Sequence, residues 1–220
     1  MPQTSRHFAI IGLGSFGSTV GGELARFDNH VIGLDVKAER VNAMAEKLSQ
    51  AMIADARDEA ALREAGVGDC DVALIAVGDD MEASVLSLIN LKLLGVGEIW
   101  AKANSKAHHR ILSKLGADRV VQPEEQMGLH IAQMLHNPFV RDYVSLGNGL
   151  HVVNFRVPES LEGRKLADLD LMTRYELRCV GIMRGTEFVG RDGEACVLES
   201  ADRLLLLGTR GNLRKFGASL

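Results

Sequence analysis

A glycine-rich segment near the amino terminus constrains this chain more than any other feature. Gly12, Gly14 and Gly17 follow the apolar run 8–11 and precede a stretch with helical spacing. In a strand–turn–helix unit, the first glycine permits a tight turn and the second lets a diphosphate approach the backbone. The third lets the helix pack closely on the strand. The segment predicts a phosphate-binding turn, although three glycines alone also fit an ordinary loop.

Residues 1–122 alternate short apolar runs with helical patterns, which is the order of βαβ units around a parallel sheet. The central run 73–77 is continuously apolar, as is typical of a strand covered on both faces. We therefore predict an α/β fold with a Rossmann-like doubly wound parallel sheet. The expected strands are 8–12, 31–35, 51–54, 72–77, 98–102 and 119–121, and the expected helices are 16–27, 38–47, 58–65, 81–94 and 106–115. The last three helices end at glycines suited to left-handed caps, Gly66, Gly95 and Gly116.

The pattern changes at Pro123. Residues from Glu124 to about Met134 have the spacing of one helix, and Pro123 suits its first turn. We expect a linker at 123–142 and a smaller α+β domain at 143–220. Its expected strands are 150–157, 178–184, 187–189 and 203–208, with helices at 166–171 and 212–216 and a turn-rich connection at 147–149.

Composition and charge exclude several classes of protein. The chain has 25 basic and 29 acidic residues without a long run of either sign, so a broad nucleic-acid-binding surface is not expected. Its three cysteines are widely spaced and lack a CxxC pair, which fits neither a disulfide framework nor a zinc site. The first six residues are polar, and no apolar run approaches the ~20 residues of a membrane-spanning helix. We expect a cytoplasmic protein that reaches a membrane only through a partner.

Asp35 ends the second expected strand, close to the ~20-residue offset at which a carboxylate meets the ribose of a bound dinucleotide. Such a carboxylate accepts hydrogen bonds from the 2′- and 3′-hydroxyls and repels a 2′-phosphate, so NADP should be disfavoured. The alternative role is a helix cap before Lys37. We favour the ribose role, because strand, turn, helix, strand and acid occur in the required order.

Further candidates follow other strand ends, where ligands of doubly wound sheets bind. Asp55 and Ala56 follow the third expected strand and would lie near an adenine ring. Alternatively, Asp55 and Asp58 both cap the following helix. Val77 and Gly78 end the fourth expected strand, where backbone groups would lie beside phosphate or sugar.

Two charged residues have both a binding and a plain structural interpretation. Lys102 ends the fifth expected strand, where it would meet phosphate or extend into solvent as a surface lysine. Glu124 lies in a first helical turn, where the helix dipole alone favours a carboxylate, and alternatively it binds a divalent cation. His108 and His109 diverge by about 100° on a helix, so we expect at least one at the surface.

The second domain contains no recognisable catalytic cluster. A dehydrogenase needs a proton-transfer group beside its nicotinamide, and the candidates His151, Lys165, Tyr175 and Lys215 are scattered. The sequence also lacks HExxH, GxSxG and Walker-type motifs. We therefore assign no catalytic residue and expect binding without reaction. A small NAD-dependent oxidoreductase is the alternative, and a redox-sensing DNA regulator would need a basic recognition helix that the sequence does not offer.

The chain resembles the regulator of potassium conductance (RCK/KTN) family, of the type found in cytosolic KtrA and TrkA subunits of bacterial potassium uptake systems. The segments that carry the resemblance are FAIIGLGSFGSTV, VIGLD, ADARD, VALIAVGDD, IWAKAN and KLGADRVVQPEEQMG. The segments LEGRKLADLDL, VGIMRG and ESADRLLLLGT resemble the C-terminal domain of that family. The resemblance covers nearly the whole chain.

The resemblance implies a non-enzymatic regulatory subunit that binds an adenine nucleotide, ATP/ADP or NAD(H). It implies a homo-oligomer, with dimers packed through the helix after Pro123 and an octameric ring. The ring would gate a membrane-embedded potassium-translocating subunit of the KtrB/TrkH type at the inner face of the membrane, without nucleic acid. A divalent cation, Mg or Ca, is implied beside the nucleotide.

Matched position by position, the resemblance puts the glycines of the turn at phosphate, Asp35 at ribose, Asp55 at adenine and Lys102 at phosphate. Glu124 matches an acidic residue that helps place the cation between neighbouring nucleotides. The full set of nucleotide-binding residues that we predict is Gly12, Gly14, Ser15, Phe16, Gly17, Asp35, Asp55, Ala56, Val77, Gly78 and Lys102.

This chain departs from the family pattern at two positions. Close relatives carry an arginine where this chain has Ser15, and that arginine reaches the terminal phosphate of a neighbouring ATP. This chain therefore lacks the side chain that distinguishes ATP from ADP in those relatives. The second departure is Ala201, which precedes Asp202 where the family usually has glycine. We expect an altered turn there but the same fold.

Overall fold

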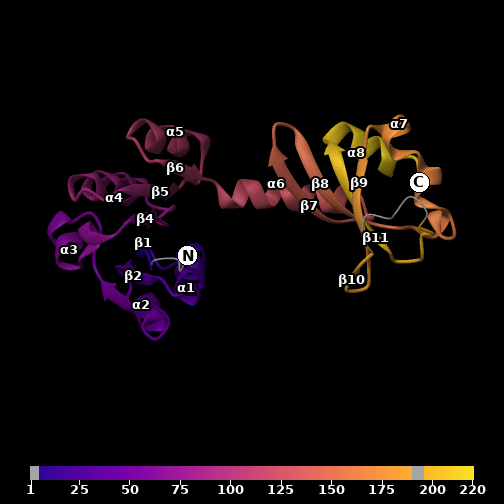
Figure 1. The fold of residues 1–220 in the computed structure, drawn as a ribbon. Coiled ribbons are helices and arrows are strands. Elements are labelled where there is room, and N and C mark those ends of the chain that lie inside the picture. Colours follow the sequence, from indigo (N-terminus) through magenta and orange to yellow (C-terminus); the bar gives the residue numbers. More distant parts are fainter. Residues whose placement is uncertain (1–4, 190–195) are drawn as a thin grey trace. The chain divides into compact units, whose positions relative to one another are not determined.

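The computed structural model describes residues 5–189 and 196–220, and the polar residues 1–4 of the sequence lie outside this description. The chain forms two compact units, Met1–Glu124 and Glu125–Leu220 (Figure 1). Among the described residues, no helix combines the length and the apolar character needed to cross a membrane.

The first unit is built on a six-stranded parallel sheet with the order β3-β2-β1-β4-β5-β6. This order confirms the predicted Rossmann-like fold. The strands are β1 (His7–Ile11), β2 (His30–Asp35), β3 (Gln50–Ile53), β4 (Val72–Ile75), β5 (Glu98–Lys102) and β6 (Arg119–Val121). The helices are α1 (Ser15–Arg26), α2 (Ala38–Met44), α3 (Glu59–Glu64), η1 (Val67–Asp69), α4 (Met81–Leu93) and α5 (Lys106–Lys114).

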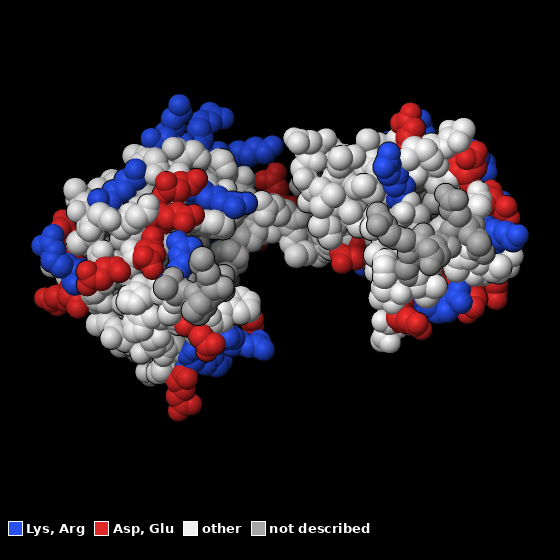
Figure 2. Space-filling view, in the orientation of Figure 1, with Lys and Arg blue, Asp and Glu red and all other residues white. Residues whose placement is uncertain are grey.

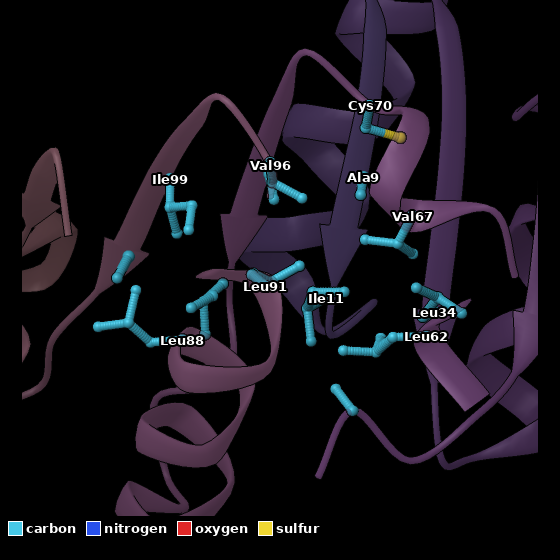
Figure 3. Packing of buried hydrophobic residues seen from close by; sticks show 14 of the residues in the cluster. Ala9, Ile11, Leu34, Leu62, Val67, Cys70, Leu88, Leu91, Val96 and Ile99 are labelled. Atoms are coloured by element: carbon cyan, nitrogen blue, oxygen red, sulfur yellow. The ribbon is translucent and has the colours of Figure 1, made fainter. Parts of the chain in front are cut away.

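Both faces of this sheet are covered, which explains the continuous apolar runs of its central strands. Ile11 belongs to a cluster with Leu62 and Leu88, from α3 and α4 (Figure 3). Its neighbour Ile10 belongs to a second cluster with Met44 of α2. Successive side chains of a strand point to opposite faces, so a sheet buried on both sides needs an apolar residue at every position.

Helix ends in the first unit agree with the predicted turn chemistry, with one difference. Gly66, Gly95 and Gly116 have φ of +75°, +79° and +86°, which confirms the three left-handed caps. Helix α2 ends at Met44 rather than at 47. Leu48 is buried beyond that end, and a Cβ on Gly33 would lie 2.5 Å from its Cδ1 atom. Leu48 packs onto β2 from the turns that follow the helix.

The histidine pair of α5 divides between core and surface. His108 is buried, and its Nε2 lies 3.1 Å from the Oγ of Ser84 on α4. Burial lowers the pKa of the His108 imidazole. His109 is partly exposed. Elsewhere on the visible face of this unit, acidic and basic side chains are mixed, with a basic group over α5 (Figure 2), where Lys106, Arg110 and Lys114 are exposed.

The second unit is an antiparallel five-stranded sheet with the order β10-β9-β11-β8-β7, packed with short helices. This confirms the predicted α+β class. Its core centres on Val153, Phe155, Leu204, Leu206 and Phe216. The strands are β7 (Val140–Gly147), β8 (Leu150–Arg156), β9 (Arg178–Arg184), β10 (Glu187–Phe188) and β11 (Arg203–Thr209). The helices are α6 (Pro123–His136), which starts at the end of the first unit, η2 (Glu159–Leu161), η3 (Leu166–Leu169), α7 (Leu171–Tyr175) and α8 (Arg210–Gly217).

Strand β7 was not predicted. It pairs with β8 through a turn in which Gly147, Asn148 and Gly149 all have positive φ. The linker predicted to end at 142 therefore ends inside a strand. Most residues of β7 are exposed, so its sequence lacks the apolar alternation that identifies a strand. The single helix predicted at 166–171 is also wrong, because Asp170, at φ +44°, separates η3 from α7.

Candidate functional site

The glycine turn between β1 and α1 has a backbone that side chains would disrupt. Gly12 has φ of +95°, and a Cβ there would lie 2.9 Å from Cγ2 of Val77. A Cβ on Gly17 would lie 1.9 Å from the carbonyl oxygen of Gly12. The first glycine therefore permits the turn and the third lets α1 start directly against it, as the spacing predicts.

The start of α1 presents unpaired backbone donors. Gly14 is the N-cap residue and contributes no side-chain hydrogen bond, and the first turn has no acidic residue. Among the described residues, no acceptor pairs with the amides of Ser15, Phe16 and Gly17. These free N–H groups and the positive end of the helix dipole favour an anion. The turn thus has the properties of a phosphate cradle.

Asp35 lies at the end of β2, against this turn, with its side chain 4% exposed. Its Oδ2 accepts hydrogen bonds from the Leu13 amide at 2.8 Å and from Nη1 of Arg40 at 3.2 Å. Its Oδ1 accepts one from the Lys37 amide at 2.9 Å. The N-cap residue of α2 is Lys37, so Asp35 braces the loop before the helix rather than capping it. A carboxylate has about four acceptor sites, which leaves one free for a ligand.

The two aspartates after β3 have different roles. Asp58 caps α3, accepting a hydrogen bond from the Ala60 amide at 2.9 Å. Asp55 instead pairs with Arg57, whose Nε and Nη2 lie 3.0 and 2.6 Å from its Oδ2. That side-chain hydrogen bond is the largest cause of the lowered pKa of the Asp55 carboxyl. Ala56, between them, is buried, and its carbonyl accepts from Nδ2 of Asn90 at 3.0 Å.

Val77 and Gly78 follow β4, which ends two residues earlier than predicted, at Ile75. The Val77 side chain lies against Gly12, and a Cβ on Gly78 would lie 2.3 Å from Oδ1 of Asn104. Nδ2 of Asn104 also donates to Oδ1 of Asp79 at 3.0 Å. Asn104 therefore joins the loops after β4 and β5 at the edge of the sheet that carries the glycine turn. Asn104 was not identified as a site residue from the sequence.

Lys102 is largely buried, with 13% of its side chain exposed, and so is not a solvated surface lysine. Its Nζ forms an ion pair with Oε1 of Glu124 and lies 5.9 Å from the ring centroid of Phe16. Hydrogen bonding from Lys102 is the main cause of the lowered pKa of the Glu124 carboxyl. The end of β5, the start of α6 and the first turn of α1 thus meet at one place.

Glu124 offers a single carboxylate that already has a cationic partner. Among the described residues, no group of three or more His, Cys, Asp or Glu side chains is arranged to hold a metal ion. The described residues of one chain therefore do not by themselves fit a divalent-cation site. The cation expected at Glu124 stays a prediction.

Arg40, in the first turn of α2, was not identified from the sequence. Its Nη1 pairs with Asp35 and lies 3.8 Å from the position of a Cβ on Gly14. An arginine in the helix that follows an acidic strand end is a recognisable signal, because that helix starts at the edge where ligands bind. The residues predicted to bind nucleotide at this edge included the glycine turn and Asp35 but not Arg40.

Comparison with known families agrees with this architecture. The TrkA-N domain matches residues 8–123 and the TrkA-C domain matches residues 152–220. The chain belongs to the TrkA-N/TrkA-C (RCK) family. This confirms the resemblance inferred from the sequence segments.

Two relatives of this TrkA-N/TrkA-C chain align along nearly its whole length. Ktr system potassium uptake protein A of Bacillus subtilis is 31% identical over 96% of both chains. The protein of the same name from Vibrio alginolyticus is 34% identical over 97% of both chains. Among solved structures, the GsuK channel bound to NAD has a TM-score of 0.65 with 16% identity. That match covers 97% of this chain but only 39% of the channel, and it supports the fold alone.

Proposed function

We propose that this TrkA-N/TrkA-C chain is a non-enzymatic regulatory subunit of a potassium uptake system that binds an adenine nucleotide, ATP/ADP or NAD(H). The observation that carries the proposal is the glycine turn, whose free amides lie beside the buried carboxylate of Asp35. The names of the full-length relatives support the link to potassium uptake. GsuK, a channel with the same fold, is solved with NAD bound, which agrees with a nucleotide ligand.

In this proposal each side of the site takes one part of the nucleotide. The amides of Ser15, Phe16 and Gly17 receive phosphate, and the remaining acceptor of Asp35 receives a ribose hydroxyl. Lys102 adds a cation for phosphate. The residues after β3 and β4, Asp55, Ala56, Val77 and Gly78, border the adenosine. The nucleotide supplies binding energy and no reaction, so these residues bind and orient it.

The ligand acts through differential affinity. A nucleotide shifts a conformational equilibrium only by the ratio of its affinities for the two states, and a ~100-fold ratio corresponds to about 2.7 kcal/mol. We propose that the shape that changes is that of a homo-oligomeric ring, which contacts a membrane-embedded potassium-translocating subunit. We propose that the chain divides functionally into a nucleotide domain at 1–122, a crossover segment at 123–142, whose last residues begin β7, and a C-terminal domain at 143–220.

Helix α6 supports the oligomeric part of the proposal. Within the described residues, it carries no buried side chain, and Met127, Leu129, Ile131 and Leu135 are all exposed. Burying this many large apolar side chains against a partner is more favourable than leaving them exposed to water. A second copy of the same helix, packed across a two-fold axis, would cover them.

The Asp35→Ala variant tests the nucleotide site. We expect it to weaken ADP binding at least tenfold in isothermal titration calorimetry, because the ribose loses its carboxylate acceptor. Asp80→Ala is the matched control, since Asp80 is another loop aspartate in the same unit but caps α4. Equal ADP affinity in wild type and Asp35→Ala would contradict the assignment. Substrate-dependent NADH turnover that Asp35→Ala abolishes would instead establish an oxidoreductase.

A further inference from the structure

The side chain of Arg40 lies over Gly14 in the glycine turn. Gly14 is the second glycine of the turn, whose missing side chain leaves room for a diphosphate. A Cβ built on Gly14 would point toward Nη1 and Cζ of Arg40, at 3.8 and 4.0 Å, and would meet no other neighbouring group within 4 Å. The guanidinium thus lies where the turn is open to phosphate.

Arg40 has spare capacity to bind a second anion. It makes one contact among the described residues, from Nη1 to Oδ2 of Asp35, and its side chain is 45% exposed. A guanidinium carries five N–H donors in a planar fork that matches phosphate oxygens in pairs. Its charge persists at all physiological pH values. Most of its donors therefore remain free for a ligand.

The pair with Asp35 links this arginine to the ribose position. Oδ2 of Asp35, which accepts from Arg40, also accepts from the amide of Leu13 inside the glycine turn. The carboxylate proposed to bind ribose is therefore hydrogen-bonded to the same turn whose amides are proposed to bind phosphate. The 2′- and 3′-hydroxyls of a ribose need two acceptor sites, and Asp35 has only one free, so the second hydroxyl competes with Arg40 for the carboxylate.

We propose that Arg40 is a phosphate-binding residue of this site and exchanges Asp35 for the 5′-diphosphate of the nucleotide when it binds. This inference rests on the proposed nucleotide-binding function. The ribose takes acceptor capacity of Asp35, and the guanidinium moves its free donors onto phosphate above Gly14. One charge-assisted contact replaces another, so the buried carboxylate and the arginine both stay paired. The exchange also supplies the cation that Ser15 does not offer.

The exchange predicts that the site distinguishes ligands with a 5′-phosphate from ligands without one. Adenosine must loosen the Asp35–Arg40 pair without offering an anion in return, whereas ADP completes the exchange. Arg40 therefore selects for 5′-phosphorylated ligands and contributes little to recognition of the nucleoside itself.

Calorimetry on the 220-residue chain tests this with three probes: ADP, adenosine and 2′-AMP. Arg40→Ala should weaken ADP binding about 10- to 100-fold, the range of one charge-assisted hydrogen-bonded contact, and leave adenosine binding unchanged or stronger. Arg40→Lys should restore part of the ADP affinity, since it keeps the charge but loses the planar fork. Arg63→Ala is the matched control, because Arg63 is also an exposed helical arginine in an ion pair, with Glu59.

The possible outcomes separate this inference from the proposed function. If wild type binds ADP and Arg40→Ala binds it equally well, the inference fails while the nucleotide site stands. Equal weakening of ADP and adenosine would reduce Arg40 to a support for Asp35 and overturn the phosphate role. If Arg40→Ala loses only the binding of 2′-AMP, the guanidinium contacts a 2′-phosphate, and this result would also overturn the proposed role at the 5′-diphosphate. If wild type binds none of the three probes, the proposed function fails and the inference fails with it.

Discussion

Each unit of the molecule contains a buried aspartate paired with a partly exposed arginine beside a tight turn, yet the two arrangements differ. In the first unit, Asp35 is 4% exposed and Arg40 gives it one hydrogen bond. In the second, Asp202 is 1% exposed and accepts from both Nε and Nη2 of Arg184, at 3.0 and 2.8 Å. Arg184 also contacts Glu199 and the carbonyl of Val197. The second arginine is largely committed, whereas the first has donors to spare.

The turns beside the two ion pairs also differ in how many of their hydrogen-bonding groups are paired. The turn beside Asp35 is rich in glycine and ends in free helix amides. The turn beside Asp202 holds Ala201 at φ +69°, and its Glu199 amide donates to Oδ2 of Asp202 at 2.9 Å. A buried cluster whose hydrogen-bond donors and acceptors are all paired stabilises the fold, whereas a cluster with unpaired donors can bind a ligand. We therefore interpret the Asp202–Arg184 pair as structural and the Asp35–Arg40 pair as part of a binding site.

The largest expected effect tests whether the glycine turn is as constrained as its contacts imply. Gly17→Ala should destabilise the first unit by about 3 kcal/mol or more, since its Cβ would overlap the carbonyl of Gly12. Urea unfolding followed by fluorescence of Trp100 measures this, because the only tryptophan of the chain lies in β5 of that unit. Gly22→Ala on the same helix is the control. Its Cβ would make only an ordinary contact, at 3.9 Å from Met44, and should stabilise the protein by about 0.5–1 kcal/mol. Equal stability of the two variants would contradict the steric account.

A smaller effect is expected from the saturated pair. Asp202→Asn should lower the free energy of unfolding by about 2 kcal/mol, because a buried acceptor of charge-assisted hydrogen bonds is lost. Glu199→Gln is the control on the same guanidinium; Glu199 is exposed, so its loss should change stability by less than about 0.5 kcal/mol. ADP affinity should be unchanged in both. A loss of ADP binding in Asp202→Asn would break the distinction between the two pairs.

The Asp202 pair also predicts a pH dependence. Burial raises the pKa of the Asp202 carboxyl, but hydrogen bonds from Arg184 and the Glu199 amide, with the charge of Arg184, outweigh it and lower the pKa below its ordinary value. A lowered pKa in the folded state stabilises the fold above the unfolded-state pKa of about 4, and this stabilisation is lost as the pH falls through the lowered value. The stability difference between wild type and Asp202→Asn should therefore shrink below about pH 4.

The smallest effect concerns the alanine in the second turn. Ala201→Gly should stabilise the protein by about 0.5 kcal/mol, because a left-handed alanine costs about 1–2 kcal/mol and glycine returns part of this as chain entropy. Ala218→Gly is the control, since this exposed alanine has φ of −77° and should lose stability on the same change. Thermal unfolding by circular dichroism measures both. Destabilisation by Ala201→Gly would mean that the turn carries no strain.

Much of the first unit was predictable, because its signals are local. The glycine caps, the strand runs and Asp35 lie within short windows whose backbone requirements decide the residue type. Strand β7 was missed because it is mostly exposed and depends on pairing with β8. Asp55 and Asp58 were both considered as caps of the helix after β3, and the structure shows only Asp58 in that role.

The sequence by itself determined the parallel sheet, the glycine turn and the acidic residue at the end of β2, because each requires particular residues at fixed spacing along the chain. Only the tertiary structure decided which charges meet. It brought Arg40 over Gly14 and against Asp35, and it paired Lys102 with Glu124 beside Phe16. Long charged side chains reach across elements, so their partners depend on the distances between strand and helix ends, which the order of residues does not specify.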